Sequence, residues 1–194
     1  MKQPFKGYFR ISQHFGGNGV DIYKARGDLG HGGTDFAMPI GTPILSSVNG
    51  VVIGVSTDIQ KGLGIAVLSS DKFEYNGQKC LLSTVYWHLS RIDVKIGEKV
   101  KAQQQIGLSG NTGITSGPHL HLSITPLDLK GKKMLTSPNN GYRGHINPLP
   151  YLELEPEDTK VKELQELLIK YGAKIKADNV LGPLTLRAFH EIYD

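Results

Sequence analysis

The sequence has little cysteine, no long hydrophobic run and few aromatic residues. Its 194 residues include a single cysteine, Cys80, so an internal disulfide is excluded and we expect this side chain to fill the core. No apolar stretch approaches the roughly 18 residues that a membrane-spanning helix needs, so we expect no membrane insertion. The basic residues of segment 1–7 are not followed by an apolar run of about 7–15 residues, so the sequence predicts no secretory signal.

Aromatic residues make up 8% of the chain, and the lysines are scattered. The basic stripe with stacking aromatic residues that is typical of nucleic-acid-binding proteins is therefore missing, and we predict no nucleic-acid partner. The formal net charge of +4 favours an anionic partner such as a bacterial cell wall. Glycine, by contrast, is abundant: 24 glycines and 10 prolines indicate many turns between short strands and argue against an all-helical fold.

Residues 40–125 show the pattern of an antiparallel sheet. Short apolar runs bounded by glycines lie at residues 51–53 and 65–68, and Asn76-Gly77 is a strong signal for a tight hairpin. The fold class predicted for this part of the chain is therefore mainly β.

Two segments alternate with a period of two, residues 84–89 and residues 119–124. In the first segment the buried face is expected to carry Val85, Trp87 and Leu89, and the open face Thr84, Tyr86 and His88. In the second segment the buried face is expected to carry Leu120, Leu122 and Ile124, and the open face His119, His121 and Ser123. Strands that present histidines on an open face predict the floor of a groove.

The composition changes after residue 152. We predict a main domain at residues 1–152, an acidic, proline-containing linker at residues 153–159 and a small α-helical unit at residues 160–194. Roughly 35 residues are fewer than the ~40 that usually form a stable domain alone, so this unit is expected to pack on the main domain or on a partner.

The C-terminal unit is predicted to hold two helices. Apolar residues recur at helical spacing from Val161 to Tyr171, with Asp158 or Thr159 as the N-cap and Gly172 as the end of the helix. A second helix is predicted to begin at Gly182-Pro183, because proline is favoured in the first helical position.

Histidines and one aspartate gather in three short segments, residues 31–35, 86–88 and 119–121. A catalytic zinc ion takes three protein ligands and keeps a fourth position for water, and two histidines with one carboxylate meet this requirement. His31 and Asp35 would supply two of these groups. The glycines between them argue against a helix, so we place them on a loop that enters a strand.

His119 and His121 point the same way, and one of them completes the set of three ligands. The other is then free to act as a base, and His88 is a second candidate for this role or for holding the tetrahedral oxyanion. Histidine suits proton transfer because its ordinary pKa of about 6.5 lets it accept a proton from water and return it to a leaving amine.

Three blocks of the sequence resemble the signature motifs of the lysostaphin-type (LytM-like) zinc endopeptidases: residues 31–44 (HGGTDFAMPIGTPI), 86–90 (YWHLS) and 116–121 (SGPHLH). The resemblance covers about residues 8–152. It implies an antiparallel β-sheet metallopeptidase domain with a groove, which binds one zinc ion (Zn²⁺) per chain and hydrolyses a cross-bridge or stem peptide of bacterial peptidoglycan. We expect such an enzyme to be a monomer that acts at the bacterial cell wall.

Carried over by position, the zinc ligands of this family would be His31, Asp35 and His121, and its catalytic histidines would be His88 and His119. The family often has an acidic residue where Ser123 stands, so the ring of a histidine would be oriented by a backbone carbonyl or by water instead.

Tyr23 and Tyr86 are candidate substrate contacts. Tyr86 shares the predicted open face with His88, and Tyr23, on a loop before His31, would help to stabilise an oxyanion. A packing role is the alternative for both tyrosines.

Residues 161–189 are similar to helical peptidoglycan-binding repeats, which implies that the C-terminal unit tethers the enzyme to the wall. A bacteriophage endolysin that reaches the wall through a holin pore would explain a wall-directed enzyme without an export signal, and a protein made without its export signal is the alternative. One alternative is a catalytically silent member of the same fold that binds the wall or activates another hydrolase. Another is a lipoyl-type carrier barrel, suggested by residues 94–113, although no hairpin-tip lysine there is clearly suited to the cofactor.

Overall fold

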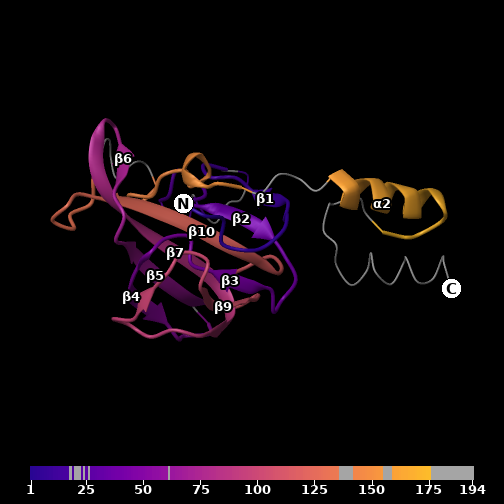
Figure 1. The fold of residues 1–194 in the computed structure, drawn as a ribbon, viewed down its shortest axis with the longest axis horizontal. Coiled ribbons are helices and arrows are strands. Elements are labelled where there is room, and N and C mark those ends of the chain that lie inside the picture. The colour runs from indigo at the N-terminus through magenta and orange to yellow at the C-terminus, as the bar shows by residue number, and fades with distance from the viewer. Residues whose placement is uncertain are drawn as a thin grey trace. The chain divides into compact units, whose positions relative to one another are not determined.

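The computed structural model describes residues 1–17, 19, 23, 25, 27–60, 62–135, 142–154 and 159–175 (Figure 1). The chain divides into two compact units. One consists of Met1–Phe5 and Ile11–Glu153, and the other of Lys6–Arg10 and Leu154–Asp194. The strands of the described residues lie in the first unit, together with every predicted site residue.

The first unit is built on a ten-stranded sheet, and its described pairings are antiparallel, as the sequence predicts. The strands are β1 (Ile11–Gln13), β2 (Thr34–Ala37), β3 (Pro43–Leu45), β4 (Gly50–Ser56), β5 (Leu63–Ser69), β6 (Phe73–Tyr75), β7 (Gln78–Ile92), β8 (Lys99–Val100), β9 (Gln105–Ser109) and β10 (His119–Leu127). Their order is β1-β2-β10-β7-β5-β4-β8; β9 pairs with β3 and β7, and β6 pairs with β7. β10 therefore lies between β2 and β7 (Figure 1).

The predicted hairpin joins β6 to β7 at Asn76-Gly77. Both residues are left-handed, with φ of 50° and 72°, as a type I′ turn requires. The apolar runs at residues 51–53 and 65–68 lie within β4 and β5, which pair with each other. The predicted mainly β fold is confirmed.

The core side of the sheet follows the predicted alternation on β10. Leu120, Leu122 and Ile124 are fully buried. Phe36 of β2 pairs with Leu120, and its ring meets the ring of Phe5 edge-on, with centroids 4.9 Å apart. Burying side chains of this size stabilises the fold by about 1.5–3 kcal/mol each. This apolar face fixes the register of β10 and leaves its histidines on the opposite face.

Cys80 belongs to a buried cluster with Leu82, Ile124 and Ile146. Its side chain is fully buried and forms no disulfide. The prediction that this residue fills the core is confirmed.

The predicted faces of β7 are wrong for residues 84–87. Thr84 and Tyr86 are fully buried, whereas Val85 and Trp87 are only partly buried. Trp87 lies directly opposite His121, so the two side chains share a face. The histidine-bearing face of the sheet therefore contains the tryptophan, and the core contains the tyrosine.

The physical reason is a β-bulge at His88. Leu63 and Gly64 are adjacent on β5, but they pair with Leu89 and Trp87, so His88 is an extra residue in β7. Its φ of 65° is left-handed. The alternation changes phase at this point, which returns Leu89 to the core and directs His88 to the same side as Trp87.

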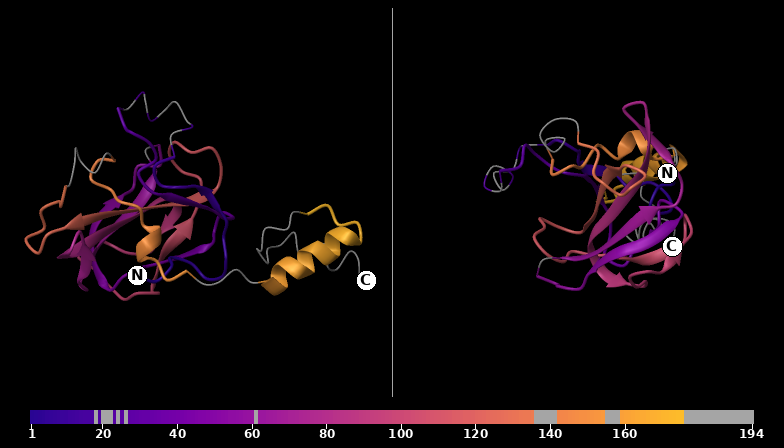
Figure 2. Two further views of the ribbon diagram at one scale, coloured as in Figure 1. Left: turned by 90° about the horizontal axis from the view of Figure 1, so that it is seen from above. Right: turned by 90° about the vertical axis from the view of Figure 1, so that its left-hand side faces the viewer.

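Two segments outside the strands contact each other, one before β2 that contains Phe15 and Asp28 and one after β10 that contains Tyr142 and Arg143 (Figure 2). The ring centroids of Phe15 and Tyr142 are 4.5 Å apart. A short 3-10 helix, Leu149–Tyr151, ends the second segment. The two segments form a wall beside the sheet.

The second unit contains helix α2 (Thr159–Lys170) among its described residues. The helix ends at Lys170, and the predicted stop, Gly172, follows two residues later with a left-handed φ of 97°. The amide of Gly172 donates to the carbonyl of Ile169, and the amide of Ala173 donates to the carbonyl of Leu168. These are the two bonds of a Schellman motif, which satisfy carbonyls that a helix end would otherwise leave unpaired.

Asp158, one of the two predicted N-caps, and the predicted second helix from Gly182-Pro183 lie outside the described residues. Within the described part of the chain, no helix has the length and hydrophobicity that a membrane span requires.

Candidate metal centre

The five predicted metal-binding and catalytic residues come from separate parts of the fold. Asp35 lies on β2, His119 and His121 on β10, His88 on the bulge of β7, and His31 on the loop before β2. Because β2 pairs with β10, Asp35 and His121 are cross-strand neighbours on one face. The sheet brings all five side chains to the same pocket.

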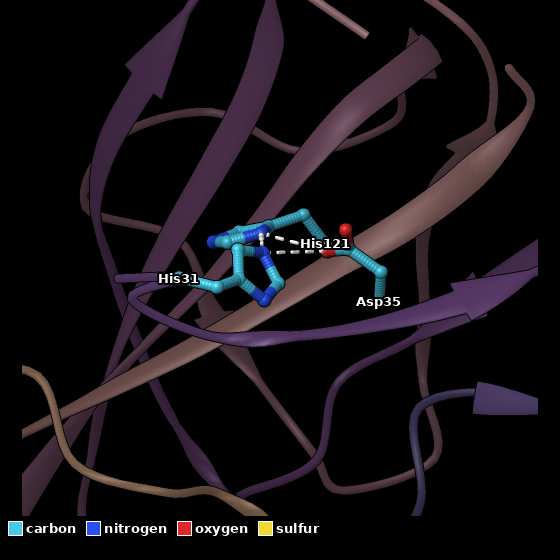
Figure 3. A group of neighbouring side chains, drawn as sticks. All are labelled: His31, Asp35 and His121. Atoms are coloured by element: carbon cyan, nitrogen blue, oxygen red, sulfur yellow. Dashed lines mark hydrogen bonds and ion pairs between the residues drawn. The ribbon is translucent and has the colours of Figure 1, made fainter. Parts of the chain in front are cut away.

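His31, Asp35 and His121 point toward one another (Figure 3). Asp35 Oδ1 lies 2.8 Å from His121 Nδ1 and 3.1 Å from His31 Nε2, and these two ring nitrogens are 2.9 Å apart. His31 and Asp35 are buried, and His121 is partly buried. The three atoms form a compact triangle that could hold a metal ion.

The donor set fits zinc. Two imidazole nitrogens and one carboxylate oxygen are ligands that zinc prefers, and they leave a fourth position open. The sides of the triangle are a few tenths of an ångström shorter than the roughly 3.3 Å expected between ligand atoms of tetrahedral zinc. Each corner presents a lone pair when both histidines are neutral, and a bound cation relieves the repulsion between three such atoms.

The ring of His31 is held by backbone groups. Its Nδ1 lies 3.2 Å from the carbonyl oxygen of His14, so that a proton on Nδ1 leaves the lone pair on Nε2. The amide of Gly16 donates to the carbonyl of His31, and the amide of His31 donates to the carbonyl of Gly17. A backbone carbonyl thus orients this ring, which is one of the two alternatives expected from the serine at position 123.

Gly33 is the point of closest approach between the His31 loop and β10. A Cβ atom at this position would lie 2.5 Å from the carbonyl oxygen of Leu122 and 2.7 Å from the ring of His121. A side chain there would displace His121, so glycine is required by packing against the His121 ring.

The protonation states at the triangle suit metal binding. Burial by itself would raise the pKa of Asp35, but hydrogen bonds to His121 and His31 outweigh it and hold this pKa well below its ordinary value. Burial lowers the pKa of His121 by more than the nearby Asp35 carboxylate raises it. Near neutral pH the carboxyl group is therefore ionised and the His121 ring neutral, as a metal ion requires of its ligands.

His88 and His119 form a second pair, with ring centroids 4.6 Å apart. His88 Nδ1 lies 2.7 Å from the carbonyl oxygen of Thr112, and His119 Nδ1 lies 2.8 Å from that of Gly117. A proton on each Nδ1 donates to its carbonyl and leaves each Nε2 as an acceptor. Burial lowers the pKa of His88 to about 4, against a smaller opposing effect of the Thr112 carbonyl. His88 is therefore neutral near neutral pH.

The pocket has a volume of about 600 Å³. Several of its described lining residues were not predicted as site residues, namely Gln13, Asp28, Trp87, Ile114, Thr115, Tyr142, Arg143 and His145. For Trp87 a signal exists in the sequence, because the apolar phase of β7 changes between Leu82 and Leu89. For Asp28 and Arg143 no local pattern marks the position, since their contact joins residues far apart in the chain.

The two predicted substrate contacts have different outcomes. Tyr23 lines the pocket, with its ring centroid 5.9 Å from that of His31, and its contact with substrate stays a prediction. The prediction for Tyr86 is wrong, because its side chain is fully buried and its hydroxyl accepts a hydrogen bond from the amide of Ser47 over 2.7 Å. The bulge at His88 is the cause, since it places residue 86 on the opposite face from the histidine.

Comparison with known proteins supports the resemblance of the three motif blocks. The model of peptidase family M23 matches residues 29–135. The peptidoglycan DD-endopeptidase ShyA of Vibrio cholerae is 34% identical over 180 residues, which cover 91% of this chain and 38% of ShyA. The chain thus spans less than two fifths of the length of this curated relative.

Two solved structures share the fold. The catalytic domain of the antimicrobial peptidase lysostaphin from Staphylococcus simulans matches with a TM-score of 0.56 and 26% identity, over 74% of this chain and 91% of that domain. A zinc-containing peptidase from Vibrio cholerae matches with a TM-score of 0.53 and 32% identity, over 68% of this chain and 37% of that one. The family match spans more than half of this chain and includes the four histidines and the aspartate of the site. The chain therefore belongs to peptidase family M23.

Proposed function

We propose that this chain is a zinc-dependent endopeptidase that hydrolyses peptide bonds of bacterial peptidoglycan. The observation that carries the proposal is the convergence of His31 Nε2, Asp35 Oδ1 and His121 Nδ1 in a pocket that also holds His88 and His119. Membership of peptidase family M23 supports it, as do the named activities of ShyA and lysostaphin.

In this proposal one zinc ion is held by His31, Asp35 and His121. The zinc-containing peptidase of Vibrio cholerae supports the choice of metal. When bound, zinc supplies a Lewis acid that polarises a carbonyl group and lowers the pKa of water. The chain's own contribution is a triangle of donors that lines the pocket, with Asp35 and His121 on paired strands and His31 on the loop before β2.

His119 is the proposed proton acceptor. Its Nε2 lies 3.6 Å from Asp35 Oδ2, so the ring faces the donor triangle. The same ring returns the proton to the leaving amine. His88 stays neutral, and its Nε2 accepts a hydrogen bond that orients the attacking water or the amine, because Thr112 holds its other nitrogen.

The proposed bond is a D,D cross-link between stem peptides, since ShyA, a DD-endopeptidase, aligns with 91% of this chain. A peptide cross-bridge is the alternative bond. The catalytically silent scaffold predicted as an alternative function has less support, because such a protein needs no complete donor set.

The C-terminal unit, residues 160–194 after a linker at 153–159, is proposed to tether the enzyme to the wall and so to raise the local concentration of substrate. We also propose that the protein is a monomer that acts at the bacterial cell wall, and that it is a bacteriophage endolysin released through a holin. Expression of this protein in a bacterial host with and without a holin tests the endolysin proposal, because lysis of the host would require the holin pore.

Digestion of purified peptidoglycan tests the proposed function. Sacculi with direct stem cross-links and sacculi with glycine bridges are treated with the wild-type chain, His121→Ala and His14→Ala, and the fragments are identified by mass spectrometry. We expect cleaved D,D cross-links with the wild type and with His14→Ala, whose side chain lies outside the described lining of the pocket. Absence of any cleaved peptide bond with the zinc-loaded wild type would contradict the proposal.

A further inference from the structure

One wall of the pocket is closed by a contact between two loops. Arg143 Nε donates to Asp28 Oδ1 over 2.6 Å, and both side chains line the pocket. On either side of this ion pair the same two segments meet again, Phe15 against Tyr142 and Gly32 against the ring of His145.

Arg143 is held in an unusual backbone conformation. Its φ of 57° is left-handed, which costs a residue with a side chain about 1 kcal/mol or more. Lys133 Nζ donates to the carbonyl of Arg143 over 3.2 Å, and Gly144 follows with φ of 92°. These contacts hold the start of the arginine side chain in place at the rim of the pocket.

The ion pair uses one of the five N–H groups of the guanidinium. Asp28 accepts the Nε hydrogen, and its side chain is 15% exposed. The side chain of Arg143 is 63% exposed, so the two Nη groups remain available to a ligand. Such groups form the planar, paired donors that bind a carboxylate.

The charges of the pocket point in the same direction. Among the described residues that line the pocket, Arg143 is the one with a permanently cationic side chain, whereas Asp28 and Asp35 are acidic. Asp35 is committed to the histidine triangle, and Asp28 is the partner of Nε. A cation aimed into a pocket of this composition favours an anionic group on the bound peptide.

We propose that the Arg143 guanidinium binds a carboxylate of the peptide in the pocket and thereby selects substrates with a free carboxyl group next to the scissile bond. The inference rests on the proposed function. A D,D peptide bond joins a D residue to the amine of a second D centre, and that centre carries its own carboxyl group beside the bond. Conversion of this group to a carboxamide removes the charge and leaves the scissile bond unchanged.

Two matched peptides test the proposal, one with the free carboxylate after a D-alanyl scissile bond and one with the carboxamide. We expect Arg143→Gln to raise KM for the carboxylate peptide by about tenfold or more, at nearly unchanged kcat, and to leave the carboxamide peptide unaffected. Arg143→Lys keeps the charge but loses the paired geometry, so its KM should be intermediate. Asp28→Asn keeps Arg143 and should retain the preference for the carboxylate.

A purely structural role of Arg143 predicts another result. If Arg143→Gln lowers kcat/KM equally for both peptides, or if the wild type shows no preference between them, the proposal is wrong. Zinc content and the thermal midpoint are measured for each variant, because a collapsed wall would change both.

Binding of the same peptides to His88→Ala separates this proposal from the proposed function. Calorimetry should show that His88→Ala binds the carboxylate peptide more tightly than the carboxamide peptide. This difference should vanish in the double variant His88→Ala/Arg143→Gln. Equal binding of both peptides would overturn the role of Arg143 even if the wild type hydrolyses them. A wild type that hydrolyses neither peptide would instead count against the proposed function.

Discussion

β10 and β7 are paired strands that supply histidines to one pocket, but they present them by different means. β10 is regular, so His119 and His121 share a face, and Leu120 and Leu122 lie in the core. β7 contains an extra residue, His88, whose left-handed backbone shifts the phase of the strand. A regular strand places ligands through alternation alone, whereas a bulged strand places one side chain by breaking it.

The two mechanisms have different consequences for neighbouring residues. On β10, a change at one histidine leaves the apolar face and its register intact. On β7, the bulge decides that Trp87 lies opposite His121 and that Tyr86 lies in the core. Substitutions in β10 should therefore affect chemistry with little effect on folding, and substitutions around the bulge should affect both.

The largest effect is expected on β10, for His121→Ala. Removal of one of three donors should abolish bound zinc and wall hydrolysis together, because two ligands do not hold a catalytic zinc ion. His119→Ala is the matched variant on the same face, and it should keep most of the zinc while it loses turnover. Elemental analysis and peptidoglycan digestion check both variants. Equal zinc contents in the two would contradict the ligand assignment.

The next effect is expected at the bulge, for His88→Ala. We expect kcat to fall by about 10²- to 10⁴-fold, with zinc retained, because in the proposed function the ring orients reacting groups and is not a metal ligand. His88→Asn tests the backbone separately, since asparagine accepts a left-handed φ. His88→Asn should therefore have a higher thermal midpoint than His88→Ala, but the same low turnover. Loss of zinc from both variants would show that His88 belongs to the metal site.

A smaller effect is expected for Gly64→Ala, opposite the bulge. A Cβ atom at Gly64 would lie 2.5 Å from Cε3 of Trp87, so the indole on the pocket face must move. We expect the free energy of unfolding to fall by about 1–3 kcal/mol, with a weaker binding of substrate. Gly54→Ala on β4 is the control, because its Cβ would meet Ala66 at an ordinary 3.5 Å. If Gly64→Ala and Gly54→Ala unfold at the same urea concentration, Trp87 is not tightly packed against residue 64.

The smallest effect is expected for Tyr86→Phe. This change leaves the buried amide of Ser47 without its acceptor and should cost about 1–3 kcal/mol of unfolding free energy. Activity per folded molecule should not change, because residue 86 faces the core. A raised KM at unchanged stability would instead restore Tyr86 as a substrate contact.

Much of this site follows from local sequence. The alternation of residues 119–124 predicts a strand with two histidines on one face, and Asn76-Gly77 predicts the hairpin that begins β7. Gly32 and Gly33 indicate a loop, and the structure adds that Gly33 is needed for contact with the ring of His121. For the strand, the hairpin and the loop the physical cause lies within a few residues of the pattern, whereas the contact of Gly33 with His121 joins distant residues.

The rest depends on contacts that no local pattern contains. The bulge at His88 is set by pairing of β7 with β5, which a single strand does not reveal, so simple alternation predicts the wrong face for Tyr86. The pair of Asp28 and Arg143 joins loops that are separated by most of the sheet. Such side chains are recognised as parts of the pocket only when the sheet has brought the loops together.

The measurement that tests the central claim most directly is the zinc content of the natively purified chain, determined together with that of His121→Ala. Our account predicts about one zinc ion per wild-type chain, which a chelator removes along with activity and which added zinc restores, and none in the variant. A wild-type chain that contains no zinc and takes up none when zinc is added would contradict it.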